Sequence, residues 1–366
     1  MSMLRVGLIG CGKIAAIYAS NLQTRFHDRL HLLLCADLDL PRAEAFAREH
    51  QIQAVSVDEL IASPEIDVVL NLTIPSAHFA LSLSALQNGK HVYSEKPLAT
   101  TLEEGRKLLR EAKKRGLYLG CAPDTFLGGG MQTVRQLLAN GAIGTPVSFA
   151  VNMLACGPEF THPRPEFYYQ PGAGPLMDMG PYYITALISL LGPVDSVCGM
   201  GGSVFPVRTC HAPERLGDTF RAAVDTSVHA LIRMQSGLTG TFCMSWDHPR
   251  KYWESGASFI EIRGSEGRIE CPDPNTFGGS YGAFFDEPEN RIRFVSASGQ
   301  KRSLPLLPDS VTCNARGLGL YQAVQAMEEG SSPAVNATLA MHVLEVLLGI
   351  EQSCRSGQRI SFLQHI

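Results

Sequence analysis

The stretch Leu4–Ala15, with the sequence LRVGLIGCGKIA, decides the fold of this 366-residue chain. Its apolar run, Leu4–Ile9, is typical of a buried parallel strand and leads directly into the pattern Gly-x-Gly-x-x-Ala, which opens an amphipathic segment. Gly10 permits a tight turn, Gly12 lets the backbone approach a pyrophosphate, and Ala15 lets the following helix pack close to the strand. Because the helix N-terminus offers free N–H groups to phosphates, the stretch predicts a dinucleotide site.

The same alternation of apolar runs and amphipathic segments continues to residue 122. Strands that alternate with helices predict a parallel sheet covered on both faces, so we expect an α/β Rossmann domain over residues 1–122. The predicted strands are Leu4–Ile9, Leu30–Ala36, Val68–Leu72, His91–Tyr93 and Leu117–Cys121, and the predicted helices are Ile14–Leu22, Pro41–Glu49, Ser76–Gln87 and Leu102–Arg115.

The pattern changes after residue 122, where strand-like runs are joined by tight turns such as Gln235-Ser236-Gly237. Neighbouring strands joined in this way are antiparallel, so we expect residues 123–366 to form an α+β domain with a largely antiparallel sheet. The expected strands are Val147–Met153, Ser196–Met200, Val224–Met234, Leu238–Trp246, Ser258–Arg263 and Arg291–Val295, and the expected helices are Met131–Asn140, Leu318–Glu329 and Ala337–Arg355. Two long loops, 155–174 and 205–220, are candidates for function.

Composition excludes several classes of partner. The net charge is −4 and no long basic run is present, so neither nucleic acid nor an anionic membrane is expected. No stretch is apolar for long enough to span a bilayer. Ten cysteines are spread singly without a Cys-x-x-Cys pair, which predicts no metal site and favours a reducing compartment. Since no signal peptide is recognisable, we expect a cytoplasmic protein.

Asp37 ends the second predicted strand. A carboxylate at this point accepts hydrogen bonds from the ribose hydroxyls of a bound dinucleotide and repels a 2′-phosphate. No arginine follows immediately, so the sequence favours NAD over NADP. The alternative role, an acid that caps the next helix, suits Asp39 better.

The tripeptide Glu95-Lys96-Pro97 follows the strand that begins at His91. Ligands of open α/β sheets bind in the crevice at the carboxyl ends of the strands, and a lysine there can hydrogen-bond a substrate hydroxyl and favour its alkoxide. The alternative is an ordinary surface lysine.

Taken together, these motifs resemble the glucose–fructose oxidoreductase / inositol dehydrogenase / MocA (Gfo/Idh/MocA) family. The resemblance extends over nearly the whole chain. Besides the glycine loop and the Glu-Lys-Pro signature, it includes Thr73-Ile74-Pro75 with His78, Gly89–Tyr93, and Gly172–Gly180 ahead of the position where the family carries Asp-x-Gly-x-His.

The resemblance implies an NAD(P)-binding Rossmann domain and a second domain that often forms dimer or tetramer contacts. Lys96 matches the family's catalytic lysine and Asp178 matches its aspartate. A carbohydrate or polyol is the implied substrate. The expected cofactor contacts are Gly10, Gly12, Lys13, Ile14, Asp37, Thr73, Pro75, His78, Glu95 and Lys96.

The sequence departs from one common family pattern, because Tyr182 stands where many members carry histidine. Some members similar to glucose–fructose oxidoreductase and dihydrodiol dehydrogenase have tyrosine there. A nearby ammonium such as that of Lys96 favours a phenolate, so Tyr182 is expected to exchange the hydroxyl proton as hydride moves. Tyr183 points about 100° away on a helix and is expected to pack.

Substrate contacts are expected from the segment His162–Gln170, which is rich in aromatic and polar residues. Rings can lie against the C–H faces of a sugar while polar groups bind its hydroxyls; the equally weighted alternative is a surface lid that packs its own aromatics. The candidates in this segment are His162, Tyr168 and Tyr169. Two more lie elsewhere: Asp124 at the domain junction and Trp246 at the end of a predicted strand.

Three functions are compatible with these features. The first is an NAD(H)-dependent oxidoreductase that moves hydride to or from a secondary hydroxyl carbon of a sugar, sugar acid or cyclitol. The second keeps NAD tightly bound and recycles it within one cycle, as in sugar oxidoreduction or glycosidic cleavage, and is distinguished by the absence of released NADH. The third, a non-catalytic NAD-binding sensor, is disfavoured by the presence of both Lys96 and a proton carrier.

Overall fold

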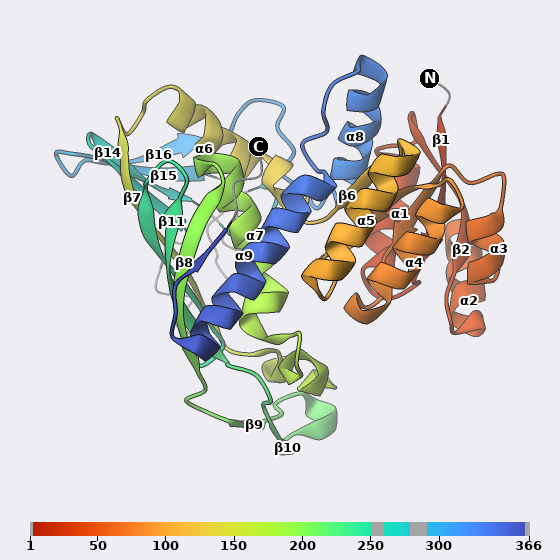
Figure 1. The fold of residues 1–366 in the computed structure, drawn as a ribbon, viewed down its shortest axis with the longest axis horizontal. Helices are drawn as coiled ribbons and strands as arrows, with labels where there is room; N and C mark the ends of the chain where they lie inside the picture. The colour runs from red at the N-terminus through yellow and green to blue at the C-terminus, as the bar shows by residue number, and fades with distance from the viewer. Residues whose placement is uncertain (1–2, 250–259, 272, 279–290, 363–366) are drawn as a thin grey trace. The chain divides into compact units, whose positions relative to one another are not determined.

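The computed structural model of the protein describes residues 3–249, 260–271, 273–278 and 291–362 (Figure 1). The chain forms two compact units. The first unit contains residues 1–127 and 314–344, and the second contains residues 128–313 and 345–366. This division differs from the expected 1–122 and 123–366, because a late segment packs with the N-terminal residues. Contacts between segments so distant in the sequence leave no local pattern to read.

The first unit is built on six parallel strands in the order β3-β2-β1-β4-β5-β6. This is the predicted Rossmann sheet, and the prediction is confirmed. The order reverses at β1, so the carboxyl ends of β2 and β4 flank the end of β1. The strands are β1 (Leu4–Ile9), β2 (Leu30–Ala36), β3 (Gln53–Ala54), β4 (Val68–Asn71), β5 (His91–Ser94) and β6 (Leu119–Cys121).

Helices cover both faces of this sheet, and their ends follow local sequence signals. In α5, Thr101 and Glu104 form a reciprocal capping box and Gly116 takes the left-handed conformation just past the last turn. The helix α3, which was not predicted, begins with the same device at Ser56 and Glu59, a signal that could have revealed it. The helices are α1 (Ala15–Thr24), α2 (Leu40–His50), α3 (Val57–Ala62), α4 (Pro75–Gln87), α5 (Leu102–Arg115) and α8 (Leu318–Glu329).

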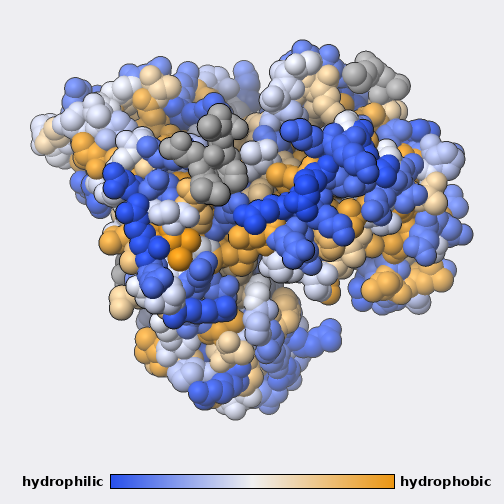
Figure 2. Space-filling model, in the orientation of Figure 1, coloured by the Kyte–Doolittle hydropathy of each residue, from blue (hydrophilic) through white to orange (hydrophobic). Residues whose placement is uncertain are grey.

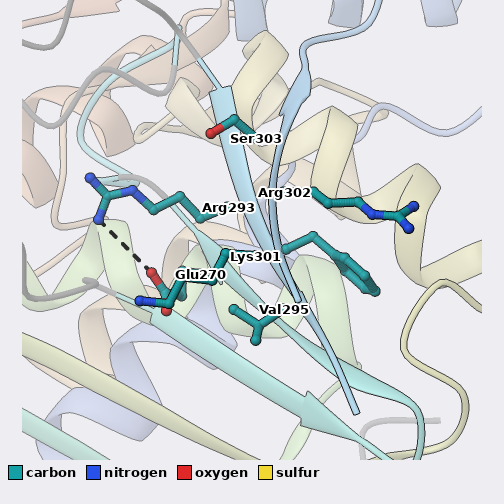
Figure 3. Close-up of a pocket in the computed structure, with 7 residues that line it drawn as sticks. Glu270, Arg293, Val295, Lys301, Arg302 and Ser303 are labelled. Atoms are coloured by element: carbon teal, nitrogen blue, oxygen red, sulfur yellow. Dashed lines mark ion pairs between the residues drawn. The ribbon is translucent and has the colours of Figure 1, made fainter. Parts of the chain in front are cut away.

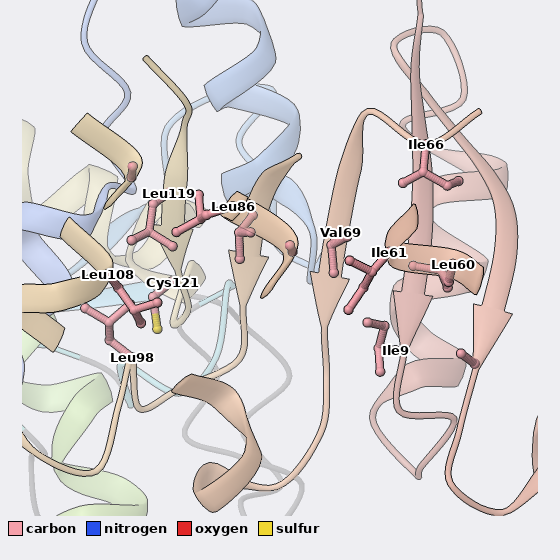
Figure 4. Close-up of a cluster of buried hydrophobic side chains, with 14 of the residues drawn as sticks. Ile9, Leu60, Ile61, Ile66, Val69, Leu86, Leu98, Leu108, Leu119 and Cys121 are labelled. Atoms are coloured by element: carbon pink, nitrogen blue, oxygen red, sulfur yellow. The ribbon is translucent and has the colours of Figure 1, made fainter. Parts of the chain in front are cut away.

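One hydrophobic cluster fills the space between the sheet and the helices α3, α4 and α5 (Figure 4). Ile9, Val69 and Leu119 point into it from three strands, and Leu60 and Leu108 reach it from two helices. Side chains alternate between the faces of a strand, so the neighbours of these residues point to the opposite layer. Burial on both faces explains why these strands read as continuous apolar runs.

Among the described residues, the second unit contains a sheet of nine strands in the order β16-β15-β14-β13-β7-β12-β11-β8-β17. The predicted, largely antiparallel sheet is confirmed, with one parallel pair, β7 and β12. Ser258, which begins one predicted strand, lies outside the described residues. The strands are β7 (Pro146–Leu154), β8 (Val194–Gly202), β11 (Ser227–Met234), β12 (Thr239–Ser245), β13 (Ile260–Gly264), β14 (Gly267–Cys271), β15 (Arg291–Ser296), β16 (Lys301–Pro305) and β17 (Ile360–Ser361), and a separate pair is formed by β9 (Val207–Thr209) and β10 (Thr219–Arg221).

Helices α6 (Gly129–Ala139) and α7 (Gly174–Leu191) pack on one face of this sheet. A Cβ atom on Gly180 would lie 2.6 Å from Leu347 Cδ2, so glycine lets α7 approach α9 (Ala337–Ser356) closely. Short 3-10 helices η2 (Pro158–Phe160) and η3 (Pro165–Tyr169) precede α7.

The surface carries many charged residues, and Figure 2 shows hydrophilic residues over the exposed side of α5, whose last turn holds Lys113, Lys114 and Arg115. Within the described ranges, the structure has no helix long and apolar enough to cross a membrane.

Candidate functional site

The glycine loop lies between the end of β1 and α1. Gly10 has a φ of +98°, and a Cβ there would lie 2.7 Å from the carbonyl oxygen of Leu72, so both conformation and space require glycine. A Cβ on Gly12 would meet nothing within 4 Å. The amides of Gly12, Lys13 and Ile14 donate to no acceptor in the described part of the chain. An open helix N-terminus with spare donors fits a pyrophosphate.

Asp37 is fixed beside this loop. Its Oδ2 accepts a hydrogen bond from the Cys11 amide at 2.9 Å, and its Oδ1 accepts one from the Asp39 amide at 2.9 Å. Nη1 of Arg42 lies 3.6 Å from Asp37 Oδ1, while Nη2 lies 3.0 Å from Asp39. Sequence reasoning missed Arg42, although its position three residues after a helix-capping aspartate could have suggested it.

Two exposed apolar side chains also border the loop and were not predicted. Leu38 follows β2 and is 100% exposed, and Ile74 precedes α4 and is 67% exposed. Since the ends of β2 and β4 flank β1, these side chains lie on either side of the glycine loop's strand. Exposed apolar groups at this position suit the flat base of a nucleotide.

The backbone of Lys96 is fixed from the side of Glu95. Glu95 Oε1 accepts a hydrogen bond from the Tyr18 hydroxyl at 2.8 Å, and Oε2 accepts one from the Lys96 amide at 3.0 Å. Tyr18 is fully buried in α1, and its burial beside Glu95 raises the pKa of the phenol well above its usual range. The phenol therefore stays a hydrogen-bond donor to the carboxylate.

His78 fixes the same loop from the other side. Its Nδ1 lies 2.7 Å from the carbonyl oxygen of Pro97, and its Nε2 lies 3.0 Å from that of Thr73. The side chain is fully buried, and burial lowers the pKa of the imidazole. His78 was expected to contact a cofactor, but in the structure its ring points inward and links the loop after β4 to the loop after β5. Pro75, which follows the loop after β4, is exposed.

Asp124, an expected substrate contact, is 1% exposed. Its Oδ2 accepts hydrogen bonds from the amides of Gly317 at 2.9 Å and Gly319 at 3.0 Å, at the start of α8. Burial raises the pKa of the carboxyl to about 6. These contacts assign Asp124 to holding the returning segment in the first unit, rather than to an accessible site.

In the second unit, α7 carries the other two expected catalytic residues. Asp178 and Tyr182 are four positions apart and share one face of the helix. Asp178 is half-buried and Tyr182 is 8% exposed. Tyr183 is fully buried and donates to Asp273 Oδ1 at 3.2 Å, which confirms that it is a packing residue.

Four of the expected substrate residues lie in one aromatic cluster. Ring centroids are 5.5 Å apart for His162 and Tyr168, 6.2 Å for Tyr168 and Trp246, and 5.4 Å for Tyr169 and Trp246. Tyr169 is fully buried and Trp246 is 5% exposed, whereas His162 and Tyr168 are half-buried. The segment therefore packs its own aromatics and keeps two of them within reach of solvent.

A buried ionic network, which sequence reasoning missed, lies beside this cluster. Arg208 Nη2 donates to Glu159 Oε1 at 2.6 Å and to the Trp246 carbonyl at 2.8 Å, and Nη1 donates to Asp247 Oδ1 at 2.6 Å. The Tyr169 hydroxyl donates to the other oxygen of Glu159. The network unites η2, η3, β9 and the end of β12, which are far apart in sequence.

A separate pocket of about 300 Å³ lies on β14, β15 and β16 (Figure 3). Glu270 and Arg293 form an ion pair of 3.9 Å there, and Arg302 points away from it. None of the expected site residues lines it. The described residues contain no group of three His, Cys, Asp or Glu side chains able to hold a metal ion.

A parallel sheet with an open glycine loop at its switch point defines a dinucleotide-binding protein, and comparison with known proteins identifies the class. Residues 4–122 match the oxidoreductase family with an NAD-binding Rossmann fold, and residues 131–270 match the GFO/IDH/MocA C-terminal domain. The chain belongs to the GFO/IDH/MocA family of oxidoreductases, which confirms the expectation from its motifs.

Individual relatives of this chain are named as dehydrogenases and reductases, in agreement with the family. A trans-1,2-dihydrobenzene-1,2-diol dehydrogenase of Macaca fascicularis is 30% identical over 248 residues, 66% of this chain and 68% of that protein. A 1,5-anhydro-D-fructose reductase of Ensifer adhaerens is 25% identical over 369 residues, 97% of this chain and 98% of that protein. The solved structure of a levoglucosan dehydrogenase in complex with NADH has a similar fold, with a TM-score of 0.81 at 19% identity over 99% of this chain and 100% of that chain.

Proposed function

We propose that this protein transfers hydride to or from a secondary hydroxyl carbon of a sugar, sugar acid or cyclitol. The observation that carries the proposal is the double anchoring of Lys96, through Glu95 and Tyr18 on one side and through Pro97 and His78 on the other. Fixing the backbone on both sides limits the positions that the side chain can reach, which suits a group that must meet a reacting atom. NAD, when bound, supplies the nicotinamide carbon that accepts or returns the hydride.

The proposed roles follow from the chemistry of each side chain. The Lys96 ammonium donates a hydrogen bond to the reacting oxygen and favours its alkoxide. Tyr182 exchanges the hydroxyl proton, and Asp178, on the same helix face, binds a neighbouring hydroxyl or orients the phenol. The relatives named for a dihydrobenzene diol and for 1,5-anhydro-D-fructose support a cyclic, hydroxylated substrate.

For the cofactor we propose NAD rather than NADP. Asp37 is fixed beside the glycine loop and would repel a 2′-phosphate. Arg42, which lies beside Asp37, is already paired with Asp37 and Asp39. Asp37→Ser should raise the ratio of NADP to NAD use by about a hundredfold through the loss of repulsion. The double variant with Arg42→Ala should lose most of that gain, and an unchanged ratio in Asp37→Ser would contradict the assignment.

The test of the reaction is Lys96→Ala with a panel of sugars, sugar acids and cyclitols, read by NADH absorbance. Loss of one positioned donor lowers turnover by about a thousandfold, while NADH binding measured by calorimetry should persist. Lys107→Ala, which changes an exposed lysine on α5, is the matched control and should retain activity. Near-normal turnover in Lys96→Ala would refute the mechanism. Turnover without net NADH release would favour a cofactor recycled within the cycle.

We also propose a cytoplasmic homodimer or homotetramer formed through the sheet of the second unit. Buried and exposed residues alternate along β11. On the exposed face, Leu231 is 62% exposed, and Met200 on the adjacent strand β8 is 80% exposed, so this face presents large apolar side chains to a partner. Light scattering of Leu231→Glu should show dissociation relative to the unchanged protein.

A further inference from the structure

The second unit contains a pocket of about 440 Å³ between η2, β9 and the end of β12. This volume lies within the range of small-molecule sites, about 300–1,000 Å³. The pocket is separate from the charged one on β14–β16. Its lining combines rings with a few polar groups and includes Phe160, Phe205, Thr209, His211 and Trp246.

The walls of this pocket present flat apolar surfaces. Phe160 and His211 stack with their centroids 4.2 Å apart and their planes at 11°. Phe205 is 55% exposed and Val207 is 54% exposed, although both are apolar. Aromatic faces of this kind bury the C–H face of a ring-shaped ligand, and the exposed His211 and Thr209 can exchange hydrogen bonds with its hydroxyls.

The floor of the pocket is the buried ionic network. The side chains of Arg208, Glu159 and Asp247 are 5%, 3% and 5% exposed. Desolvating three charges is unfavourable unless their geometry is well satisfied, and here the guanidinium is bound by both carboxylates. The network ties together η2, β9 and β12, so it holds the walls in one arrangement before a ligand arrives. Two carboxylates against one guanidinium leave a net negative charge.

We propose that this pocket binds a neutral, hydroxyl-rich ring such as a pyranose or cyclitol and discriminates against anionic sugars. The proposal rests on the proposed function, since it narrows the substrate class from sugars, sugar acids and cyclitols to neutral rings. A physical link exists within the second unit: η3, whose Tyr168 and Tyr169 contact Trp246, packs against α7, the helix of Asp178 and Tyr182.

Trp246 provides the readout, because the chain has only two tryptophans and Trp253→Phe leaves Trp246 alone. In that background, myo-inositol, D-glucose and methyl β-D-glucopyranoside should shift the emission of Trp246. D-glucuronate and D-glucose 6-phosphate should bind about tenfold more weakly, equivalent to about 1.4 kcal/mol.

Two variants test the location. His211→Ala removes an exposed wall residue and Thr209→Phe fills the pocket from an exposed position, so neither removes core packing. Each should raise the Kd of the neutral probes about tenfold. Val147→Ala shortens an exposed apolar side chain of β7 that does not line the pocket and should leave the Kd unchanged.

The outcomes separate this proposal from the proposed function. No emission change with any neutral probe, equal binding of neutral and anionic probes, or unchanged Kd in both variants overturns the pocket assignment. If the neutral probes are oxidised with NAD while Thr209→Phe leaves both Kd and KM unchanged, the pocket assignment fails and the proposed function stands. If Trp246 responds as expected but no probe is oxidised, the pocket assignment stands and the proposed reaction fails.

Discussion

Replacing Tyr18 by phenylalanine removes one hydroxyl from the buried side of α1 and one hydrogen bond from the Glu95 carboxylate. The ring itself still fills its place, because Tyr18 is fully buried and only one oxygen is lost. Glu95 is then free to turn, and its second oxygen no longer has to meet the Lys96 amide. The variant therefore tests whether the anchoring of Lys96 matters for turnover.

A hydrogen bond to a charged group contributes about 1.5–3 kcal/mol. If this bond serves to position Lys96, most of that energy should be lost in the transition state, and kcat should fall about 10- to 100-fold. The KM of the sugar should change much less, because the substrate still finds its other contacts. Steady-state kinetics with NAD saturating gives both constants, and urea denaturation gives the free energy of unfolding.

Tyr118→Phe is the matched control. Its hydroxyl donates to the Val335 carbonyl at 2.8 Å in the same unit, and the residue is also buried. This variant should lose about 1 kcal/mol of stability and keep its kcat. The reasoning is refuted if Tyr18→Phe loses stability like the control while its kcat stays at the level of the unchanged protein.

Three further perturbations have expected outcomes. His78→Gln should lower kcat more than it raises the KM of the sugar. It should also reduce the free energy of unfolding by about 1–3 kcal/mol, because the Pro97 carbonyl loses its partner. An equal kcat in His78→Gln and in the unchanged protein would show that His78 only stabilises the fold. For Asp124, burial raises the pKa of the carboxyl in the folded state to about 6, above the ordinary value of 3.8. The folded state therefore favours the protonated carboxyl, and the stability that this protonated group contributes is lost as the pH rises from about 4 to above 6. Relative to Asp124→Asn, the unchanged protein should thus lose up to about 3 kcal/mol between acidic and neutral pH, measured by urea denaturation at several pH values; a difference independent of pH would contradict the cause given. Arg208→Met leaves the Glu159 carboxylate buried without its cation and should cost about 3–5 kcal/mol of stability, seen as a lower Tm, and an unchanged Tm would show that the network contributes nothing to the fold.

The parts of the site that the sequence predicts are those encoded by short-range spacing. Gly10 and Gly12 lie in one loop, and Asp37 directly follows the next strand, so a single βαβ pattern locates all three. Asp178 and Tyr182 are likewise related by one helical turn. Each of these inferences needs only the period of a helix or the alternation of elements along the chain.

The parts that sequence reading missed depend on long-range partners. Tyr18 looks like any apolar-face residue of α1 until β5 brings Glu95 beside it. Arg208 lies in the short strand β9, within a stretch that the sequence pattern predicts as a loop, and its two carboxylate partners are tens of residues away. The parallel pairing of β7 with β12 is likewise not readable from the sequence, because the residues of a strand do not say in which direction a distant partner strand runs.

The division of the chain has a consequence for biosynthesis. The first unit includes residues 314–344, so its last helix leaves the ribosome only after nearly the whole second unit has been made. Until then, the Asp124 carboxyl lacks the hydrogen bonds from the amides of Gly317 and Gly319. An expression fragment that stops at residue 127 would lack these amides permanently. A chimera that exchanges nucleotide-binding domains between relatives must therefore transplant two segments rather than one.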